Sequence, residues 1–238
     1  MENIRRRRTK KDLGNHMAIA ATTLIEQKGF EGVTLTAIAQ KAKIEPRVFY
    51  NRYNDLYDFF SEYVKKYDYW FSEIFENYSG NLFTEEGYKS TITELFQSLG
   101  ENKGMQQLLR WELSSNNYIT QRTAKLREFH TMPLATKFDE LFKDTQLDIE
   151  ATSALLIGGI YYLVLHKDLT AFSNIDINTE EGKGRIINAI SYVANIFFSE
   201  LKPNQETLLI AKKMKQNGIS IELIRECTGL TTLQIDTL

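Results

Sequence analysis

Residues 34–53 read TLTAIAQKAKIEPRVFYNRY, which is two short apolar helical segments separated by a tight turn. Thr34 is a typical N-cap for the first segment, whose apolar residues recur at helical spacing. Glu45 and Pro46 open the second segment, and proline is tolerated there because the first turn of a helix does not need its N–H. The spacing predicts a helix-turn-helix.

The second segment of this motif leaves several polar or basic side chains facing outward. A helix that sits in the major groove of DNA needs such groups near its N-terminal end, because they reach base edges and phosphates. The candidates on the outer surface are Arg47, Tyr50, Asn51 and Arg52.

Charge is distributed unevenly along the chain. Residues 1–55 contain eleven Lys and Arg against six Asp and Glu, whereas the remainder contains eighteen against twenty-five. A basic end on an acidic body favours contact between that end and a polyanion. Residues 1–11 are expected to form a flexible basic arm, which carries Arg5, Arg6, Arg7, Arg8, Lys10 and Lys11.

Composition excludes several classes of protein. The 238 residues include only three prolines and one cysteine, Cys227, so an all-α fold without an internal disulfide is expected in a reducing cytoplasm. We find no pattern typical of a signal peptide, a membrane span, a metal site, a nucleophile elbow or a phosphate-binding loop. Glu112 and Asp139 are isolated carboxylates. The chain is therefore not expected to be an enzyme or to hold a cofactor or a metal.

Helical patterns continue to the C-terminus. They cover roughly 84–100, 104–116, 118–143, 148–169 and 179–201. We predict a basic arm at 1–11, a three-helix helix-turn-helix domain at 12–54, a larger helical ligand-binding and dimerisation domain at 55–202, and a short helical appendage at 203–238.

The segment after the helix-turn-helix predicts a rigid rod. From Asp55, which can cap a helix, apolar residues continue at helical spacing to Tyr78 without a proline or glycine before Gly80. One uninterrupted helix of this length is about 36 Å long. It would carry a displacement in the larger domain to the helix-turn-helix.

Residues from about 15 to 60 resemble the TetR family of transcriptional regulators. The matching residues, in order and spacing, are Gly29, Phe30, Thr34, Ile38, Ala39, Ala42, Ile44, Phe49, Tyr50 and Tyr53. This resemblance implies a bacterial repressor that binds double-stranded DNA as a homodimer at a near-palindromic operator. It also implies release from DNA by a small-molecule effector.

The resemblance also implies roles for single residues. Tyr50 and Tyr53 would approach phosphates, Thr34 would present a helix N-terminus to a phosphate, and Arg47 would reach a base edge. The alternative places Tyr53 in the core and leaves Arg47 in solvent. Lys43 stands where the family usually has glycine at the turn, a position that often has positive φ.

A second departure bears on function. Leu56 stands where the family usually has a lysine that touches phosphate, so backbone contacts would pass to Lys43, Arg52 and the basic arm. These departures keep open an alternative function, namely a helical adaptor whose helix-turn-helix does not bind DNA.

Two segments, 148–169 and 179–201, are apolar nearly all round, as is typical of helices covered on two sides. The resemblance implies that they form a four-helix dimer interface with their mates, whereas the alternative is burial inside one monomer. The expected interface residues are Leu155, Gly158, Gly159, Tyr162, Ile190 and Phe197.

The middle helices carry aromatic residues at helical spacing. Such residues are typical of an ordinary core, but the resemblance places an effector pocket among these helices. The candidate pocket residues are Trp70, Tyr88, Trp111, Phe129 and His130.

The C-terminal segment repeats the pattern of the helix-turn-helix. Ser220 and Thr231 are plausible N-caps, and Gly229 occupies the turn. Residues 204–238 contain four basic and four acidic residues, so charge does not favour DNA. We predict a small packing or protein-contact appendage rather than a second DNA-binding unit.

Overall fold

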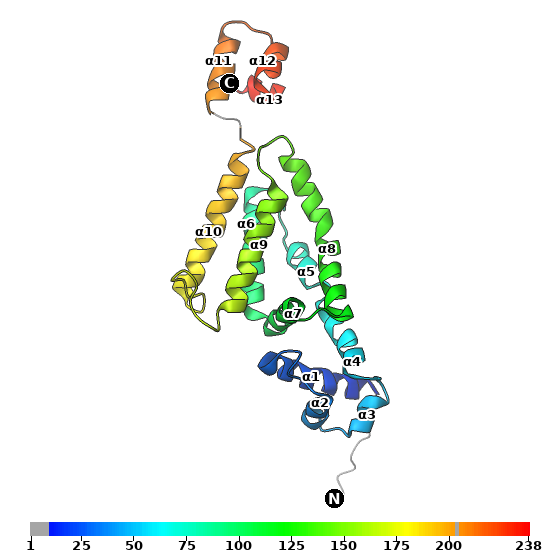
Figure 1. Cartoon of the computed structure of the whole chain (residues 1–238). Coiled ribbons are helices and arrows are strands. Elements are labelled where there is room, and N and C mark those ends of the chain that lie inside the picture. Colours follow the sequence, from blue (N-terminus) through cyan, green and yellow to red (C-terminus); the bar gives the residue numbers. More distant parts are fainter. Residues whose placement is uncertain (1–9, 203–204) are drawn as a thin grey trace, which may run out of the picture.

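The computed structural model, which describes residues 10–202 and 205–238, is a bundle of α-helices, as the sequence predicts (Figure 1). The first helices are α1 (Lys10–Lys28), α2 (Leu35–Ala42), α3 (Pro46–Tyr50), α4 (Leu56–Tyr63), the 3-10 helix η1 (Val64–Tyr67) and α5 (Trp70–Glu76). The body continues with α6 (Glu85–Glu101), α7 (Lys103–Ser114), α8 (Tyr118–Phe142), α9 (Ile149–His166) and α10 (Glu180–Ser199). The chain closes with α11 (Gln205–Gln216), α12 (Ile221–Thr228) and α13 (Thr232–Asp236).

The helix ends follow local capping chemistry. Side chains of Thr84, Asn117, Asp148 and Thr179 accept hydrogen bonds from the first-turn backbone N–H groups of α6, α8, α9 and α10. Gly29 ends α1 with a φ of 72°, a left-handed conformation that glycine adopts without strain.

One hydrophobic core runs from the helix-turn-helix into the body. It includes Phe30 between α1 and α2, Phe49 on α3, Leu99 on α6 and Ile190 on α10. In the body, α6 packs against α5, α7, α9 and α10, and α8 packs against α4, α5, α7 and α9. The position of the helix-turn-helix is therefore fixed by side-chain packing against the body.

The predicted rod is wrong, because the helix is interrupted. The chain leaves α4 at Tyr63, passes through η1, and resumes as α5 at Trp70. Contacts with α8 hold the interruption: Arg122 donates to the carboxylate of Asp68, and Nδ1 of His130 donates to the Asp68 carbonyl oxygen at 3.1 Å. These tertiary hydrogen bonds outweigh the local helical pattern.

Close packing on the other side of the interruption explains one glycine. A Cβ atom at Gly104, in the first turn of α7, would lie 2.0 Å from the hydroxyl oxygen of Tyr67. Burial and the neighbouring Tyr63 raise the pKa of Tyr67, so its hydroxyl stays neutral. The turn η1 is thus clamped between α7 and α8.

Helix α9 combines length, apolar composition and exposure. Its 18 residues have a mean hydropathy of 1.4, and 17% of them are buried in the protomer. Length and composition alone do not place a helix in a membrane. An exposed apolar helix calls for a partner surface of some kind.

The C-terminal helices have a small core of their own. Ala211, Ile224, Leu230 and Ile235 are buried together, apart from the main core. The turn residue Gly229 has a φ of 70°, and the side chains of Ser220 and Thr231 cap α12 and α13. This unit repeats the helix-turn-helix geometry, as its sequence suggests.

Candidate nucleic-acid interface

The helix-turn-helix forms as the sequence predicts. Oγ1 of Thr34 accepts a hydrogen bond from the Ala37 N–H at 3.2 Å, which caps α2. Lys43 ends α2 with a φ of 53°, and Pro46 begins α3. Lys43, which stands where the TetR family usually has glycine, therefore adopts the left-handed backbone conformation.

The structure leaves most of the predicted DNA-contacting side chains at the surface. Tyr50 is 59% exposed, which is unusual for a large aromatic side chain and leaves its ring free to meet a partner. The other exposed candidates are Thr34, Lys43, Arg47, Asn51 and Arg52. Residues Arg5, Arg6, Arg7 and Arg8 of the basic arm lie outside the described residues.

Tyr53 is placed differently from the prediction of a phosphate contact. Its side chain is 5% exposed, and its ring lies 5.2 Å from that of Phe49 and 5.1 Å from that of Phe59. Burial raises its pKa. The aromatic ring joins α3 to α4, so Tyr53 belongs to the core, as the alternative interpretation held.

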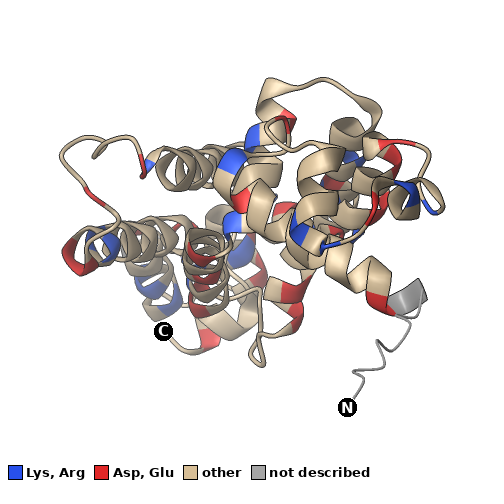
Figure 2. Ribbon diagram, turned by 90° about the horizontal axis from the view of Figure 1, so that it is seen from below, with Lys and Arg blue, Asp and Glu red and all other residues tan. Residues whose placement is uncertain are grey.

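Carboxylates accompany the basic residues of this surface. Arg47 forms an ion pair with Glu45 at 3.1 Å, and Arg52 forms one with Glu62 at 2.8 Å. Figure 2 shows basic and acidic residues interspersed along the ribbon. Both pairs are exposed, so each stabilises the protein by less than about 1 kcal/mol and can exchange its carboxylate for a phosphate.

The backbone at Lys43 leads to a first prediction. A Lys43→Gly substitution should raise the free energy of unfolding by about 0.5–1 kcal/mol. The left-handed conformation costs a residue with a side chain about 1–2 kcal/mol, and the larger backbone entropy that glycine loses on folding offsets part of this gain. Lys41→Gly, within α2, is the matched control and should lower the same quantity by about 0.5–1 kcal/mol. Urea unfolding measures both. Equal decreases in the free energy of unfolding of the two variants would contradict the prediction.

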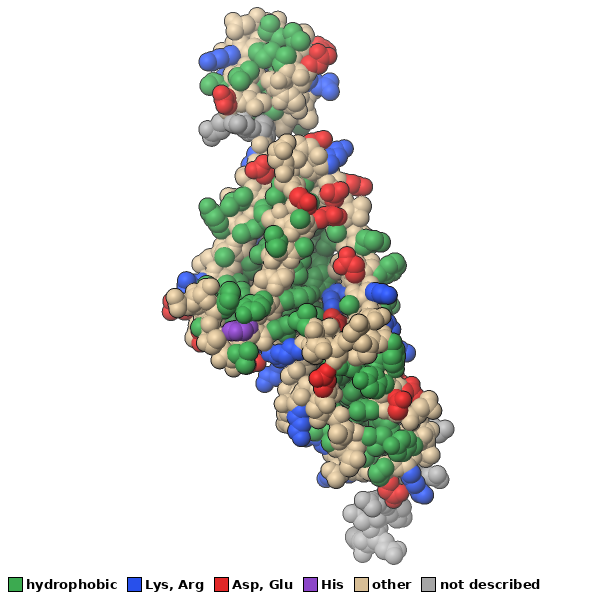
Figure 3. All heavy atoms as spheres, in the orientation of Figure 1, with side chains coloured by type: hydrophobic (Ala, Val, Ile, Leu, Met, Phe, Trp, Pro, Cys, Tyr) green, Lys and Arg blue, Asp and Glu red, His purple; other side chains and the backbone are tan. Residues whose placement is uncertain are grey.

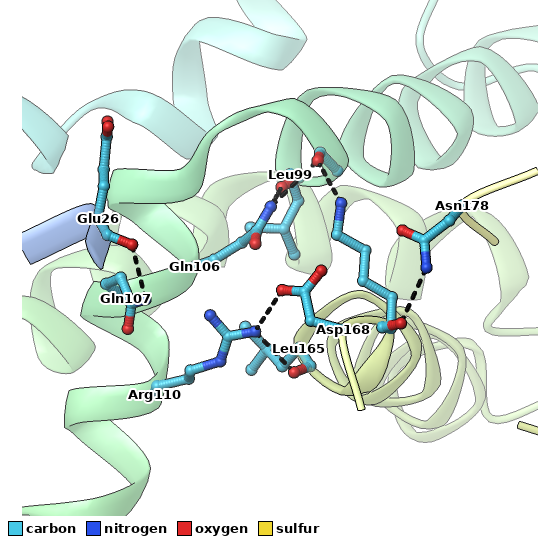
Figure 4. A network of polar contacts seen from close by, with 10 residues as sticks. Glu26, Leu99, Gln106, Gln107, Arg110, Leu165, Asp168 and Asn178 are labelled. Carbon is cyan, nitrogen blue, oxygen red and sulfur yellow. Dashed lines mark hydrogen bonds and ion pairs between the residues drawn. The ribbon is translucent and has the colours of Figure 1, made fainter. Parts of the chain in front are cut away.

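Helix α7 connects the DNA-binding end to the rest of the body. Phe30 stacks on Trp111 with ring centroids 4.5 Å apart and planes within 6°. Figure 4 shows Gln107 reaching the Glu26 carbonyl oxygen on α1 and Arg110 reaching α9, where it donates to the Leu165 carbonyl oxygen at 2.8 Å. One rigid helix thus touches both α1 and α9.

Two ion pairs close to this junction were missed by sequence reasoning. Glu112 is not isolated: it accepts hydrogen bonds from Arg127 and Thr123 on α8. Asp68 forms an ion pair with Arg122, which also lies on α8. The partners are 15 and 54 residues apart. No local spacing rule connects residues at such separations, so only the packing of α8 reveals them.

The five predicted effector residues do not line one pocket. Trp111 is buried beside Phe30, Tyr88 is buried against Phe138 and Phe197, and the ring of Phe129 is 63% exposed. His130 stacks on Tyr69, with ring centroids 4.9 Å apart. Trp70 lines a cavity between α5 and α6. Most of these aromatic residues therefore have structural roles.

The predicted dimer residues divide into two groups. Ile190 and Phe197 are wrong as surface residues: they are 1% and 5% exposed and belong to the main core, on a helix that packs against α6. On α9, Leu155 is 78% exposed and Tyr162 is 49% exposed. Gly158 and Gly159 are exposed on the same helix.

The outer face of α9 is an apolar stripe at helical spacing. Its residues are Ala151, Ala154, Leu155, Gly158, Gly159 and Tyr162. A Cβ atom at either glycine would meet nothing within 4 Å, so packing inside the protomer does not require glycine there. Figure 3 shows hydrophobic side chains exposed over α9 and along the flank of α10, where Tyr192 and Ile196 are exposed. We call this surface the α9–α10 face.

Comparison with known proteins identifies the N-terminal region. Residues 19–63 match the family model described as bacterial regulatory proteins, tetR family. A sequence search of curated proteins finds no match.

Solved structures resemble the fold over most of the chain. A TetR-like transcriptional regulator from Rhodococcus sp. RHA1 is 16% identical, with a TM-score of 0.54 over 80% of this chain and 96% of its own. The fatty acid degradation regulator FadR from Bacillus halodurans is 16% identical, with a TM-score of 0.54 over 76% and 96%. A TetR-family member from Streptomyces coelicolor A3 is 15% identical, with a TM-score of 0.53 over 75% and 88%.

The structural similarity to these proteins shows the fold, and the family match covers the helix-turn-helix that the structure shows. The pattern of exposed polar residues on α3, with apolar residues packed beneath, is what a DNA-binding unit requires. Residues 19–63 thus match the DNA-binding domain of the tetR family, and the chain as a whole has the helical fold of the TetR-family regulators that it resembles.

Proposed function

We propose that this protein is a bacterial, cytoplasmic repressor that binds a near-palindromic operator as a homodimer and is released by a small-molecule effector. The observation that carries the proposal is the exposed row formed by Arg47 and Tyr50 on α3 and by its C-cap residue Asn51, within the segment that matches the family. These side chains are exposed, so they could reach a major groove once Arg47 leaves Glu45.

The proposed DNA contacts divide into two kinds. Arg47 and Asn51 are suited to base edges, because guanidinium and amide groups hydrogen-bond to them specifically. Lys43, Tyr50, Arg52 and the N–H groups at the capped start of α2, beside Thr34, are suited to phosphates. Arg47 and Arg52 would exchange Glu45 and Glu62 for DNA, so binding should be sensitive to salt.

The α9–α10 face supports the homodimer. Two-fold assembly would cover the same stripe on both protomers, and the two glycines would let paired helices approach closely. A dimer presents two α3 helices, and its symmetry would be mirrored in the operator.

Release by an effector would act through the junction rather than through a rod. The α4 helix enters the clamped turn η1, while α7 touches both α1 and α9. A displacement of α5 or α7 would therefore reach the helix-turn-helix and the α9–α10 face together. An effector drives such a change only if it favours one arrangement over the other, and DNA must then weaken effector binding by the same factor.

The test is selection of DNA fragments bound by the full chain from a random pool. The expected result is a near-palindrome with two half-sites, and Arg47→Ala should relax the base preference at one position in each half-site. A pool without any enriched sequence, together with binding that does not depend on salt, would instead support the adaptor function. The observations that favour the adaptor function are the ion pairs of Arg47 and Arg52 with carboxylates, because these pairs already neutralise two of the basic residues proposed to bind DNA.

The basic arm leads to a second prediction. Replacing Arg5, Arg6, Arg7 and Arg8 with alanine removes up to four phosphate contacts, each of which contributes about 0.9 to the slope of log affinity against log salt. We expect a shallower slope and weaker binding to all sequences alike. Fluorescence anisotropy at several salt concentrations measures this.

The C-terminal unit offers a control with equal charge. Replacing its four basic residues, Lys212, Lys213, Lys215 and Arg225, with alanine should leave the slope unchanged. If the arm variant and the control show the same slope of log affinity against log salt, the arm does not contact DNA in the proposed way.

A further inference from the structure

Helices α11, α12 and α13 form a small unit beyond the end of α10, which we call the C-terminal unit (Figure 1). Its core consists of Ala211, Ile224, Leu230 and Ile235 and is separate from the main core. Chains of fewer than about 40 residues rarely fold stably without a disulfide, a metal or a partner, because they bury little apolar surface. The unit spans only residues 205–238, and the single cysteine, Cys227, cannot form an internal disulfide. A partner surface would therefore stabilise this unit.

Each helix of the C-terminal unit exposes large apolar side chains. They are Leu209 and Ile210 on α11, Leu223 on α12 and Leu233 on α13. Figure 3 shows hydrophobic side chains on the visible face of this unit. Exposed apolar groups at this density on a small body favour association with another surface.

Charge divides the C-terminal unit into two parts. Helix α11 has three lysines and one glutamate, whereas α12 and α13 together have one arginine and three acidic residues. Lys212 and Lys213 on α11 are exposed, as are Glu222 and Glu226 on α12. None of these side chains takes part in the ion pairs found among the described residues. The basic helix of one unit thus complements the acidic helices of an identical unit.

Two-fold symmetry would form this match twice. In an isologous contact, α11 of each copy lies against α12 of the other, so the lysines of each copy meet the glutamates of the other. Apolar residues such as Leu209 and Leu223 would be covered between the helices. The unit has equal numbers of basic and acidic side chains, which disfavours DNA as its partner. An identical unit is therefore the occupant that this surface fits best.

The position of the C-terminal unit would bring two copies of it together in the proposed dimer. The unit begins shortly after the end of α10, whose flank belongs to the α9–α10 face. The helix-turn-helix lies at the opposite end of the protomer (Figure 1). A dimer that presents both α3 helices to one duplex has both helix-turn-helix units at one end, so both C-terminal units lie at the other end.

We propose that the C-terminal unit binds the C-terminal unit of a second copy of this chain, with α11 of each copy against α12 of the other. The inference rests on the proposed homodimer and adds a second contact at the end far from DNA. No helix of the unit exceeds the 12 residues of α11, so two units bury less than the roughly 1,200 Å² of a stable interface. They therefore pair only when the α9–α10 face already holds the two copies together.

Charge reversal in the full chain tests the pairing. One variant carries Lys212→Glu and Lys213→Glu on α11, and the other carries Glu222→Lys and Glu226→Lys on α12. Each variant brings like charges together at both contacts of its own dimer. We therefore expect the dimer dissociation constant, measured by sedimentation, to rise by at least about tenfold in either variant.

A control variant carries the same change in charge outside the C-terminal unit. It combines Lys125→Glu with Lys143→Glu, because these lysines are exposed on α8 and at its C-cap. The control should dimerise like the original chain. If the α11 variant dimerises as tightly as the control, the C-terminal units do not pair, while the proposed homodimer stands. A monomeric original chain at micromolar concentration would overturn the homodimer and this inference together.

Mixing the two variants separates pairing from folding. In the mixed dimer the reversed α11 of one copy faces the reversed α12 of the other, and the two unaltered helices face each other. Both contacts again join opposite charges, so the dissociation constant should return to within about threefold of that of the original chain. A variant that had merely lost its fold would not be rescued by mixing. A mixture that dimerises no better than its components would overturn the pairing.

A spin label on Cys227 locates the contact. Cys227 is the single cysteine and is exposed on α12, so the label attaches there alone. Packed helices lie about 8–10 Å apart, and the longest helix of the unit is about 18 Å long, so paired units should give one narrow distance below about 30 Å. The α11 variant should lose this distance, and the mixture of the two labelled variants should recover it. A broad or longer distance in the original dimer would show that the C-terminal units stay apart.

Discussion

A Leu155→Asp substitution should convert the proposed dimer into monomers and lower operator affinity by at least about a hundredfold. Leu155 is 78% exposed in the protomer, so the new charge costs little in the folded monomer. In the dimer it would be buried without a partner, at a cost of about 3–5 kcal/mol for each charge. Loss of the dimer then removes one of the two half-site contacts.

Sedimentation analysis at micromolar concentration and anisotropy with the selected operator measure the two effects. Leu113→Asp is the matched control, because Leu113 is 81% exposed on α7 and is not one of the residues of the α9–α10 face. The control should remain dimeric and bind DNA normally. A dimeric Leu155→Asp variant with full affinity would place the interface elsewhere. A charge at Ile160 or Ile190 should have a different effect from one at Leu155. Both isoleucines are buried within the protomer, so the charge would unfold the protomer itself.

A Phe30→Ala substitution should lower the free energy of unfolding by about 3–5 kcal/mol, the usual cost of removing a buried phenyl group. Phe30 is 2% exposed, stacks on Trp111, and packs edge to face with Phe60, with ring centroids 5.2 Å apart. At about 2–4 °C for each kcal/mol in a chain of this size, the melting temperature should fall by roughly 6–20 °C.

Circular dichroism during heating measures this shift. Phe129→Ala is the control, since Phe129 is 63% exposed, and its free energy of unfolding should change by less than about 0.5 kcal/mol. The core is continuous across the junction, so Phe30→Ala should also lower the stability of the helix-turn-helix. A similar shift in both variants would show that the stack between α1 and α7 contributes no special stability.

Local signals predicted the helix-turn-helix well. Thr34 and Gly29 act within four residues of their own positions, so the sequence around them contains all the partners of each hydrogen bond. The same holds for the caps of the later helices, whose observed ends lie within a few residues of the predicted ones. The exposed side of α3 also followed from helical periodicity.

Periodicity did not predict which face of an apolar helix lies inside. On α10, Ile190 and Phe197 are buried against the body, whereas Tyr192 and Ile196 are exposed. All four side chains are largely apolar, so they do not by themselves mark the surface, although Asn188 and Asn195 are exposed on the same side of α10 as Tyr192. The position of α6 decides the matter. Of the predicted dimer residues, those on α9 are exposed and stay a prediction, whereas Ile190 and Phe197 on α10 are buried in the core.

Sequence by itself determined the elements whose hydrogen bonds and caps are local: the helices of the DNA-binding unit, its turn at Lys43, and the helical class of the whole chain. Only the tertiary structure decided the interruption after α4, because Arg122 and His130 hold it from a helix more than fifty residues away. The same is true of the cavity between α5 and α6. Contacts between distant segments form only after the helices pack, and their free energy can exceed the small preference of a few residues for continuing a helix.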